Sequence, residues 1–131
     1  PIFQSNEHTS GKWRLDFAKE KISVEVAFNH GGTTAWNLLK PSLASEFNHV
    51  EKAIQTELGI VIFATSEMRK AGGFDNAIGT LEKAETYLKP MYPLLPCPMV
   101  IIGSEAPETF FIEHKKDDKN RKIGHIVKNY F

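Results

Sequence analysis

The chain has 131 residues, of which 41% are hydrophobic, and this fits one globular domain with its own core. Sixteen Lys and Arg balance sixteen Asp and Glu, so no overall positive field attracts nucleic acid, and any DNA affinity has to come from a local basic surface. The single cysteine, Cys97, excludes an internal disulfide framework and a cysteine-based zinc site. With no signal peptide or membrane-length apolar run, a reducing cytoplasm is the expected location.

Residues 12–18 and 22–29 alternate between apolar and polar side chains, as half-buried strands do. If Glu20 and Lys21 form the loop of a tight antiparallel hairpin, Asp16 lies directly opposite Glu25. In the second strand, the apolar face comprises Ile22, Val24, Val26 and Phe28, and the other face comprises Ser23, Glu25, Ala27 and Asn29. The two carboxylates are therefore expected on one face of the sheet.

A long helix is predicted over residues 35–58, because apolar residues recur at spacings of three and four. The stripe comprises Leu43, Phe47, Val50, Ile54 and Leu58. Pro41 is expected to start or kink this helix.

Residues 59–65 and 98–103 are nearly unbroken apolar runs, typical of strands buried on both faces. Between them, residues 76–88 predict a helix with Asp75 or Asn76 as its N-cap. The three segments form a parallel strand–helix–strand crossover. The tail from residue 113 is interpreted as a charged loop followed by a short apolar segment, and the whole predicts a mixed α/β sheet flanked by helices.

Two carboxylates that face each other across neighbouring strands repel, unless a cation lies between them. A divalent metal is one solution, since Mg²⁺ prefers oxygen ligands and leaves places for water and a substrate phosphate. The simpler alternative is that Asp16 and Glu25 only form surface ion pairs with Arg14 or Lys12. From the hairpin alone, we favour the simpler alternative.

The motifs "LDF" with Asp16 and "VEVAFNH" with Glu25 resemble those of the PD-(D/E)xK nuclease superfamily, and more closely its BglII-like type II restriction endonucleases. In that family one strand carries an Asp, and the strand after the turn reads Glu-x-(Lys, Gln or Glu). The resemblance continues through "ASEFNH", "IVIFAT", "AGGFDNA" and "PMVIIG", over roughly residues 12 to 105. It implies a restriction-endonuclease-like fold and a Mg²⁺ ion held by Asp16, Glu25 and the backbone carbonyl of Val26.

Ala27 departs from the family pattern, because this position usually carries the Lys, Gln or Glu that orients water or stabilises developing charge. Three explanations stay open: relocation of the role, a degenerate site that binds DNA without cutting it, or an introduced substitution. We favour relocation, with Asn29 as the candidate on the same strand face. Lys40 and Glu46 are the candidates that could reach in from the helix, and Lys40 is also a candidate DNA contact.

Asn29 and His30 follow the acidic strand at the point where BglII-like enzymes approach DNA bases, and both side-chain types suit base or phosphate contacts. His30 could equally be a loop histidine without a partner. The loop 72–76 is a second candidate for DNA binding, through the residues Gly73, Asp75 and Asn76. Ordinary helix capping would explain Asp75 and Asn76 equally well.

The other features favour structural or solvated roles. The remaining histidines lack metal-ligand spacing, no serine has a triad pattern around it, and no phosphate-binding loop motif occurs. The densest basic cluster is diluted by Asp117 and Asp118, and it comprises Lys115, Lys116, Lys119, Arg121 and Lys122.

The leading hypothesis is a Mg²⁺-dependent, sequence-specific endonuclease of double-stranded DNA that acts as a homodimer, as palindromic sites require. A catalytically silent DNA-binding module and an unrelated α/β domain are the alternatives. Residues 1–131 are expected to form a single nuclease domain. Because the chain begins with Pro1 rather than Met, this domain is expected to be the C-terminal core of a longer protein.

Overall fold

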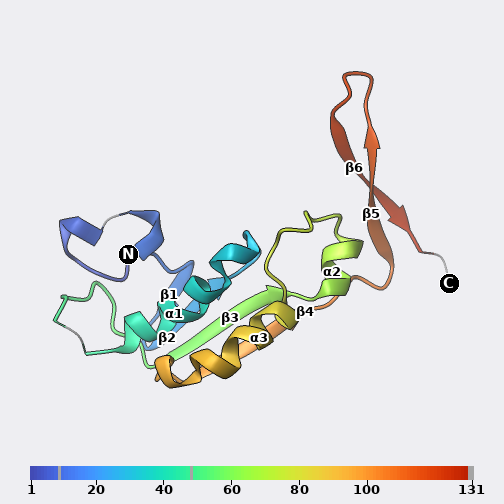
Figure 1. Cartoon of the computed structure of the whole chain (residues 1–131). Coiled ribbons are helices and arrows are strands. Elements are labelled where there is room, and N and C mark those ends of the chain that lie inside the picture. Colours follow the sequence, from blue (N-terminus) through green and yellow to red (C-terminus); the bar gives the residue numbers. More distant parts are fainter. Residues whose placement is uncertain (9, 48, 130–131) are drawn as a thin grey trace.

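The computed structural model describes residues 1–8, 10–47 and 49–129. It consists of an α/β body and a two-stranded hairpin that projects away from it (Figure 1). Within these residues, no helix combines the length and the apolar character needed to cross a membrane. Short 3₁₀ turns occur at Asn6–His8, Gly11–Trp13, Gly31–Thr33 and Tyr92–Leu94.

The body is built on a four-stranded sheet with the order β1-β2-β3-β4. Its strands are β1 (Phe17–Lys19), β2 (Ile22–Val26), β3 (Leu58–Ala64) and β4 (Met99–Ser104). β1 is antiparallel to β2, and the other pairs are parallel. The predicted mixed sheet and parallel crossover are therefore confirmed.

The predicted hairpin register is also confirmed. Lys19 pairs with Ile22, so Glu20 and Lys21 form the loop, and Glu20 adopts a positive φ of 53°. The same register, continued past the Phe17–Val24 pair, brings Asp16 opposite Glu25. The first strand is shorter than predicted, because Trp13 and Leu15 turn away to pack with Ile2 and Phe3.

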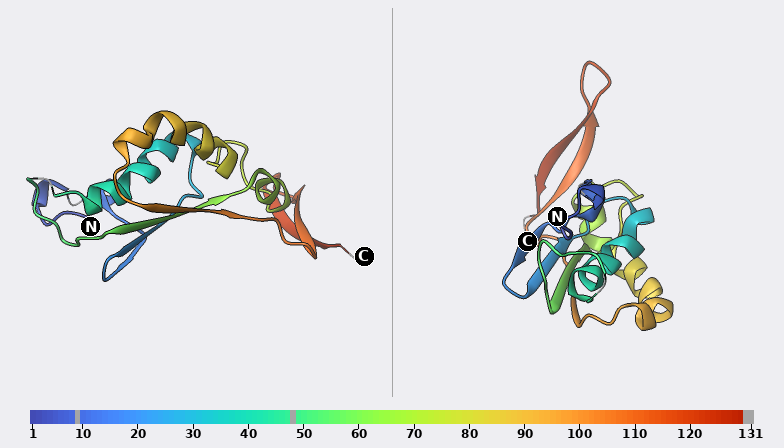
Figure 2. Two further views of the ribbon diagram at one scale, coloured as in Figure 1. Left: turned by 90° about the horizontal axis from the view of Figure 1, so that it is seen from below. Right: turned by 90° about the vertical axis from the view of Figure 1, so that its left-hand side faces the viewer.

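Two helices, α1 (Thr34–Ser45) and α3 (Leu81–Met91), cover one face of the sheet (Figure 2, left). The core lies between them and the sheet, and its buried residues are Ala27, Leu38, Val61, Phe63, Ala84 and Leu95. α1 packs closely because β3 has glycine beneath it: a Cβ on Gly59 would lie 2.5 Å from the Cβ of Pro41.

The opposite face of the sheet carries apolar side chains that nothing in the described residues covers. Val100 is 47% exposed, and Phe17, Ile22 and Ile102 are exposed as well. The prediction that residues 98–103 are buried on both faces is therefore wrong for β4, whose burial alternates. The helices instead cover the face of β2 that carries Ser23, Glu25 and Ala27.

The long helix predicted over residues 35–58 is also wrong, since α1 ends at Ser45 and Phe47 is 93% exposed. The backbone beyond it pairs with the N-terminal segment. Gln4 N–H donates to the carbonyl of Glu51, and Ala53 N–H donates to that of Ile2. These long-range bonds replace the helical ones. Pro41 lies inside α1, near its C-terminal end.

The helix predicted over residues 76–88 is α3, and it starts later than predicted, at Leu81. Thr80 is the N-cap of α3, and the Thr80 hydroxyl accepts from Lys83 N–H at 3.4 Å. Asp75 is not a helix cap: its carboxylate accepts from Ala77 N–H at 2.7 Å within a turn. A short helix, α2 (Ser66–Ala71), precedes this turn.

The tail forms an antiparallel hairpin, β5 (Phe110–Lys116) and β6 (Lys122–Lys128), rather than a loop. Asp117 organises its turn, because its Oδ1 accepts from the backbone N–H groups of Lys119 and Arg121 at 2.9 and 2.7 Å. The charged residues that indicated a loop are therefore those of the turn and the adjoining strand ends.

Candidate active site

Asp16 and Glu25 meet where β1 begins. The Oδ2 atom of Asp16 accepts from the backbone N–H of Val26 at 2.7 Å, which fixes the exposed carboxylate of Asp16 beside β2. Glu25 is only 2% exposed, since α1 covers its side of the strand. The two predicted metal ligands are therefore brought together with Val26, one at the surface and one beneath the helix.

Lys40 reaches Glu25 from α1. Its Nζ contacts the Oε1 atom of Glu25 and also donates to the backbone carbonyl of Arg14 at 3.2 Å. Lys40 is 6% exposed. Lys40, a predicted DNA contact, is the cation of a buried ion pair in this structure.

Burial raises the pKa of Glu25 above its ordinary value, and this effect outweighs the stabilisation of the carboxylate by Lys40. The nearby charge of Asp16 raises the pKa further. The second oxygen of Glu25, Oε2, is buried and has no hydrogen-bond partner among the described residues. A buried carboxylate oxygen without a donor is costly, and a cation would relieve that cost.

Ala27 is 0% exposed and belongs to the core cluster with Leu38. Its N–H donates to the carbonyl of Ile62 at 2.8 Å, continuing the β2–β3 pairing beyond Val26. Its methyl group thus lies inside the contact between the sheet and the helices. The family position that usually carries a polar residue is a packing position in this chain.

Asn29 and His30 are exposed at the end of β2, and local bonds hold both. The Oδ1 atom of Asn29 accepts from the Thr33 hydroxyl at 2.8 Å and from the Asn37 amide at 2.7 Å. His30 Nδ1 accepts from Gly32 N–H at 3.0 Å. His30 therefore caps a turn and is not a loop histidine without a partner.

The loop 72–76 lies near the end of β2, because the segment that follows it pairs with residues 29–31. Gly31 N–H donates to the carbonyl of Ala77 at 2.6 Å, and Gly79 N–H donates to that of Asn29 at 2.9 Å. The rings of Phe28 and Phe74 are also in contact, with centroids 6.1 Å apart. The two predicted recognition segments thus form one end of the body.

Gly73 has a positive φ of 63° and lies against the hairpin, where a Cβ would come within 2.7 Å of His114 Cε1. A hollow between the loop and the hairpin is lined by Gly73, Phe74, Asp75, Asn76, His114 and Lys122. Asn76 does not lie at a helix N-terminus, since α3 begins at Leu81. His114 and Lys122 were not predicted at this hollow, because the strands that carry them were not predicted.

Glu46, the other helical candidate for the role of residue 27, lies just beyond the end of α1. It is exposed, and its carbonyl accepts from Lys52 Nζ at 2.5 Å.

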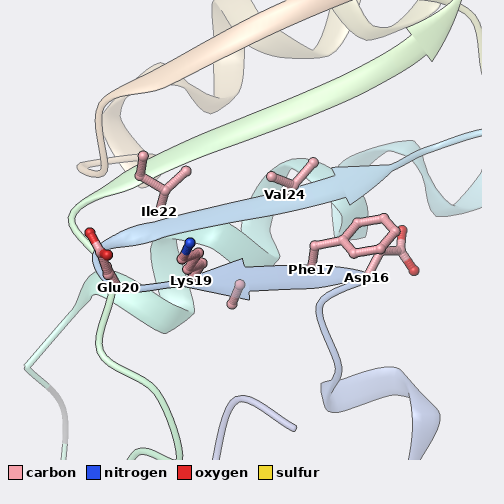
Figure 3. A pocket seen from close by; sticks show the side chains of 7 residues that line it. Asp16, Phe17, Lys19, Glu20, Ile22 and Val24 are labelled. Carbon is pink, nitrogen blue, oxygen red and sulfur yellow. The ribbon is translucent and has the colours of Figure 1, made fainter.

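A larger hollow follows the β1–β2 hairpin, with Asp16 and Glu20 at its opposite ends (Figure 3). Its other lining residues are Phe17, Ala18, Lys19, Ile22 and Val24, and Glu25 is not among them. It therefore includes one member of the carboxylate pair, Asp16, but not the other. No group of three or more His, Cys, Asp or Glu side chains suited to a metal ion occurs in the described part of the chain. Any metal would rely on two carboxylates and backbone or water oxygens.

Comparison with known proteins identifies the family. The family model described as restriction endonuclease BglII/BglIII matches residues 2–104. A solved structure of the restriction endonuclease BglII, complexed with a DNA 16-mer, is similar with a TM-score of 0.59 at 20% sequence identity. The match covers 87% of this chain and 53% of that one, so this chain spans about half its length. No curated protein matches. Because the family model covers most of the sequence, the chain belongs to the BglII/BglIII restriction endonuclease family.

Proposed function

We propose that the chain is the nuclease domain of a Mg²⁺-dependent, sequence-specific endonuclease of double-stranded DNA. The observation that carries this proposal is the buried, partnerless Oε2 of Glu25 close to Asp16, in a member of a restriction endonuclease family. The proposed reaction is phosphodiester hydrolysis: a water oxygen bonds to phosphorus, the P–O3′ bond breaks, and a 5′-phosphate and a 3′-hydroxyl remain.

The donor set fits Mg²⁺, which binds through one or two carboxylates and keeps several waters. Asp16, Glu25 and the carbonyl of Val26 would hold the ion. When bound, it supplies Lewis-acid stabilisation of the phosphate and a lowered pKa for a bound water. The chain itself fixes Asp16 through the Val26 N–H and shields Glu25 from bulk water beneath α1.

DNA would approach the end of the body where residues 29–31 lie beside residues 77–79. We assign Asn29, His30, Gly73, Asp75 and Asn76 to DNA contacts there. Asn29 was also a catalytic candidate, but its Oδ1 already accepts two hydrogen bonds, so we favour a recognition role. The DNA bound to the structurally similar BglII supports this partner. Two copies would act together, one on each strand of a palindromic site.

A catalytically silent DNA-binding domain is the second candidate, and the buried methyl group of Ala27 is the observation that favours it. Such a domain would bind a specific DNA sequence in Ca²⁺ but cut nothing in Mg²⁺ or Mn²⁺.

The deciding experiment is cleavage of mixed-sequence plasmid and phage DNA with Mg²⁺ and Mn²⁺, comparing the chain with Asp16→Asn. We expect discrete fragments from the chain and a loss of about 100-fold or more in the variant, because the charge stabilisation at the phosphate is lost. Lys12→Gln is the control, because among the described residues the Lys12 side chain has no ion pair, and only its backbone carbonyl makes a contact, with Trp36 Nε1. Sequence-specific binding without fragments would select the silent domain.

A further inference from the structure

α1 presents two polar side chains to β2, one helical turn apart. Asn37 donates to Asn29, and Lys40 contacts Glu25. Their partners are Glu25 of β2 and Asn29, which lies just beyond the end of that strand, and these two residues flank Ala27. α1 therefore places the polar groups of Asn37 and Lys40 around Ala27, the position where the family usually carries a polar side chain.

The small size of Ala27 permits this arrangement. Ala27 has no exposed surface and packs in the core beside Leu38 of α1. A longer side chain at residue 27 would have to enter the space between β2 and the helix, where the Lys40 side chain runs to Glu25. A long residue at position 27 and Lys40 in its present place would thus compete for one volume.

A positive charge near the reacting phosphate would offset the negative charges of the site. Asp16 and Glu25 carry negative charge when ionised, and phosphodiester hydrolysis adds more on the phosphate oxygens. A lysine has three N–H donors, and among the described residues Lys40 has two acceptors, the Glu25 carboxylate and the Arg14 carbonyl. No third acceptor of Lys40 Nζ occurs among the described residues.

We propose that Lys40 is a catalytic residue that supplies from α1 the cationic donor that residue 27 cannot supply from β2. Its free N–H donates to a non-bridging oxygen of the scissile phosphate, and no proton is transferred. This proposal rests on the proposed nuclease function. The competing explanation is that Lys40 only balances the buried charge of Glu25.

The test compares kcat and KM for DNA cleavage, over a range of pH, in the chain and in Lys40→Gln. Glutamine keeps a hydrogen-bond donor but not the charge, so the pKa of Glu25 should rise and the pH profile should shift upwards. If Lys40 acts on the phosphate, kcat stays about 100-fold low on the alkaline plateau, where Glu25 is ionised in both proteins. Return of kcat to the level of the chain on that plateau would overturn the proposal, since charge balance would then explain everything.

The exchange variant Ala27→Lys/Lys40→Ala is the second arm, and it decides the matter where Lys40→Gln does not fold. It moves the amine back to the strand and vacates the space on the helix. We expect cleavage within about tenfold of the original chain, and a folded but inactive exchange variant would contradict the proposal.

Lys21→Met is the matched control. Lys21 also pairs with a glutamate, Glu57, at 2.5 Å, but on the exposed surface, so its loss should leave kcat unchanged. If the original chain is folded but cleaves DNA no faster than Asp16→Asn, the nuclease function itself is overturned. An active chain with an equally active Lys40→Gln would overturn only the assignment of Lys40.

Discussion

Glu25 combines deep burial, an ion pair and an oxygen without a donor. Because the pKa of Glu25 is raised and Mg²⁺ binds the carboxylate form, apparent Mg²⁺ affinity should increase as pH rises above the ordinary glutamate pKa of 4.5 and level off above the raised pKa. Isothermal titration calorimetry across that range measures this dependence. Glu25→Gln should bind Mg²⁺ weakly at every pH, and a flat affinity profile in the original chain would rule out Glu25 as a ligand.

Ala27→Lys tests whether the loss of a catalytic side chain is the only consequence of having alanine at residue 27. Because Ala27 is fully buried beneath α1, the longer side chain overpacks the interface and brings a second amine beside Lys40. We expect a loss of about 1–3 kcal/mol in the free energy of unfolding and no gain in cleavage. Urea denaturation measures the first effect and plasmid cleavage the second. A stable, more active Ala27→Lys protein would mean that the site has room for both lysines.

At the scale of elements, Glu82 of α3 stabilises the start of α2. Its carboxylate accepts from the backbone N–H of Ser66 at 3.0 Å and from the Ser66 hydroxyl at 2.8 Å. The Ser66 N–H bond is the main cause that lowers the pKa of Glu82 to about 2. A lowered carboxyl pKa contributes stability above the ordinary glutamate pKa of 4.5, and that contribution is lost as pH falls from there to about 2.

Glu82→Gln should therefore lower the free energy of unfolding at neutral pH, by no more than about 1 kcal/mol, because water screens this exposed carboxylate. Urea denaturation at several pH values measures the difference. The difference should shrink as pH falls through this window. Glu85→Gln, on the same helix and exposed, is the matched control. An equal effect of both substitutions would exclude the contact with α2 as the cause.

At the scale of the whole molecule, the sheet has one covered and one uncovered face, although parallel strands are usually covered on both. Two valines on neighbouring strands differ in exposure for this reason. Val61 of β3 is 0% exposed, and Val100 of β4 is 47% exposed. Val61→Thr buries a hydroxyl in the core and should cost about 1–3 kcal/mol, whereas Val100→Thr should change stability by less than about 0.5 kcal/mol.

Chemical denaturation of the two threonine variants tests the uncovered face directly, because the substitution is the same in both. A large loss for Val100→Thr would mean that its face is buried in solution, by association of copies or by another contact. Sedimentation at several protein concentrations distinguishes these two causes.

Local patterns in the sequence predicted the hairpin and its register, because side-chain alternation and a two-residue loop fix which residues lie opposite each other. The apolar runs likewise predicted β3 and β4. The prediction failed for residues 46–57, where bonds to the N-terminal segment replaced the helix, and for the tail, where Asp117 forms a turn between two strands. Contacts between distant segments decide such cases.

Short-range spacing in the sequence was enough to predict the family, the mixed α/β order and the position of Asp16 opposite Glu25. Which face of β2 is buried became clear only from the packing of the helices, and the buried face is the one with the Glu25 carboxylate. The same packing brought Lys40 to Glu25, over a sequence separation of 15 residues. Alternation indicates that a strand has two faces, but burial follows from the helix that packs on one of them. In this chain α1 covers the polar face and supplies the cation that makes its burial possible.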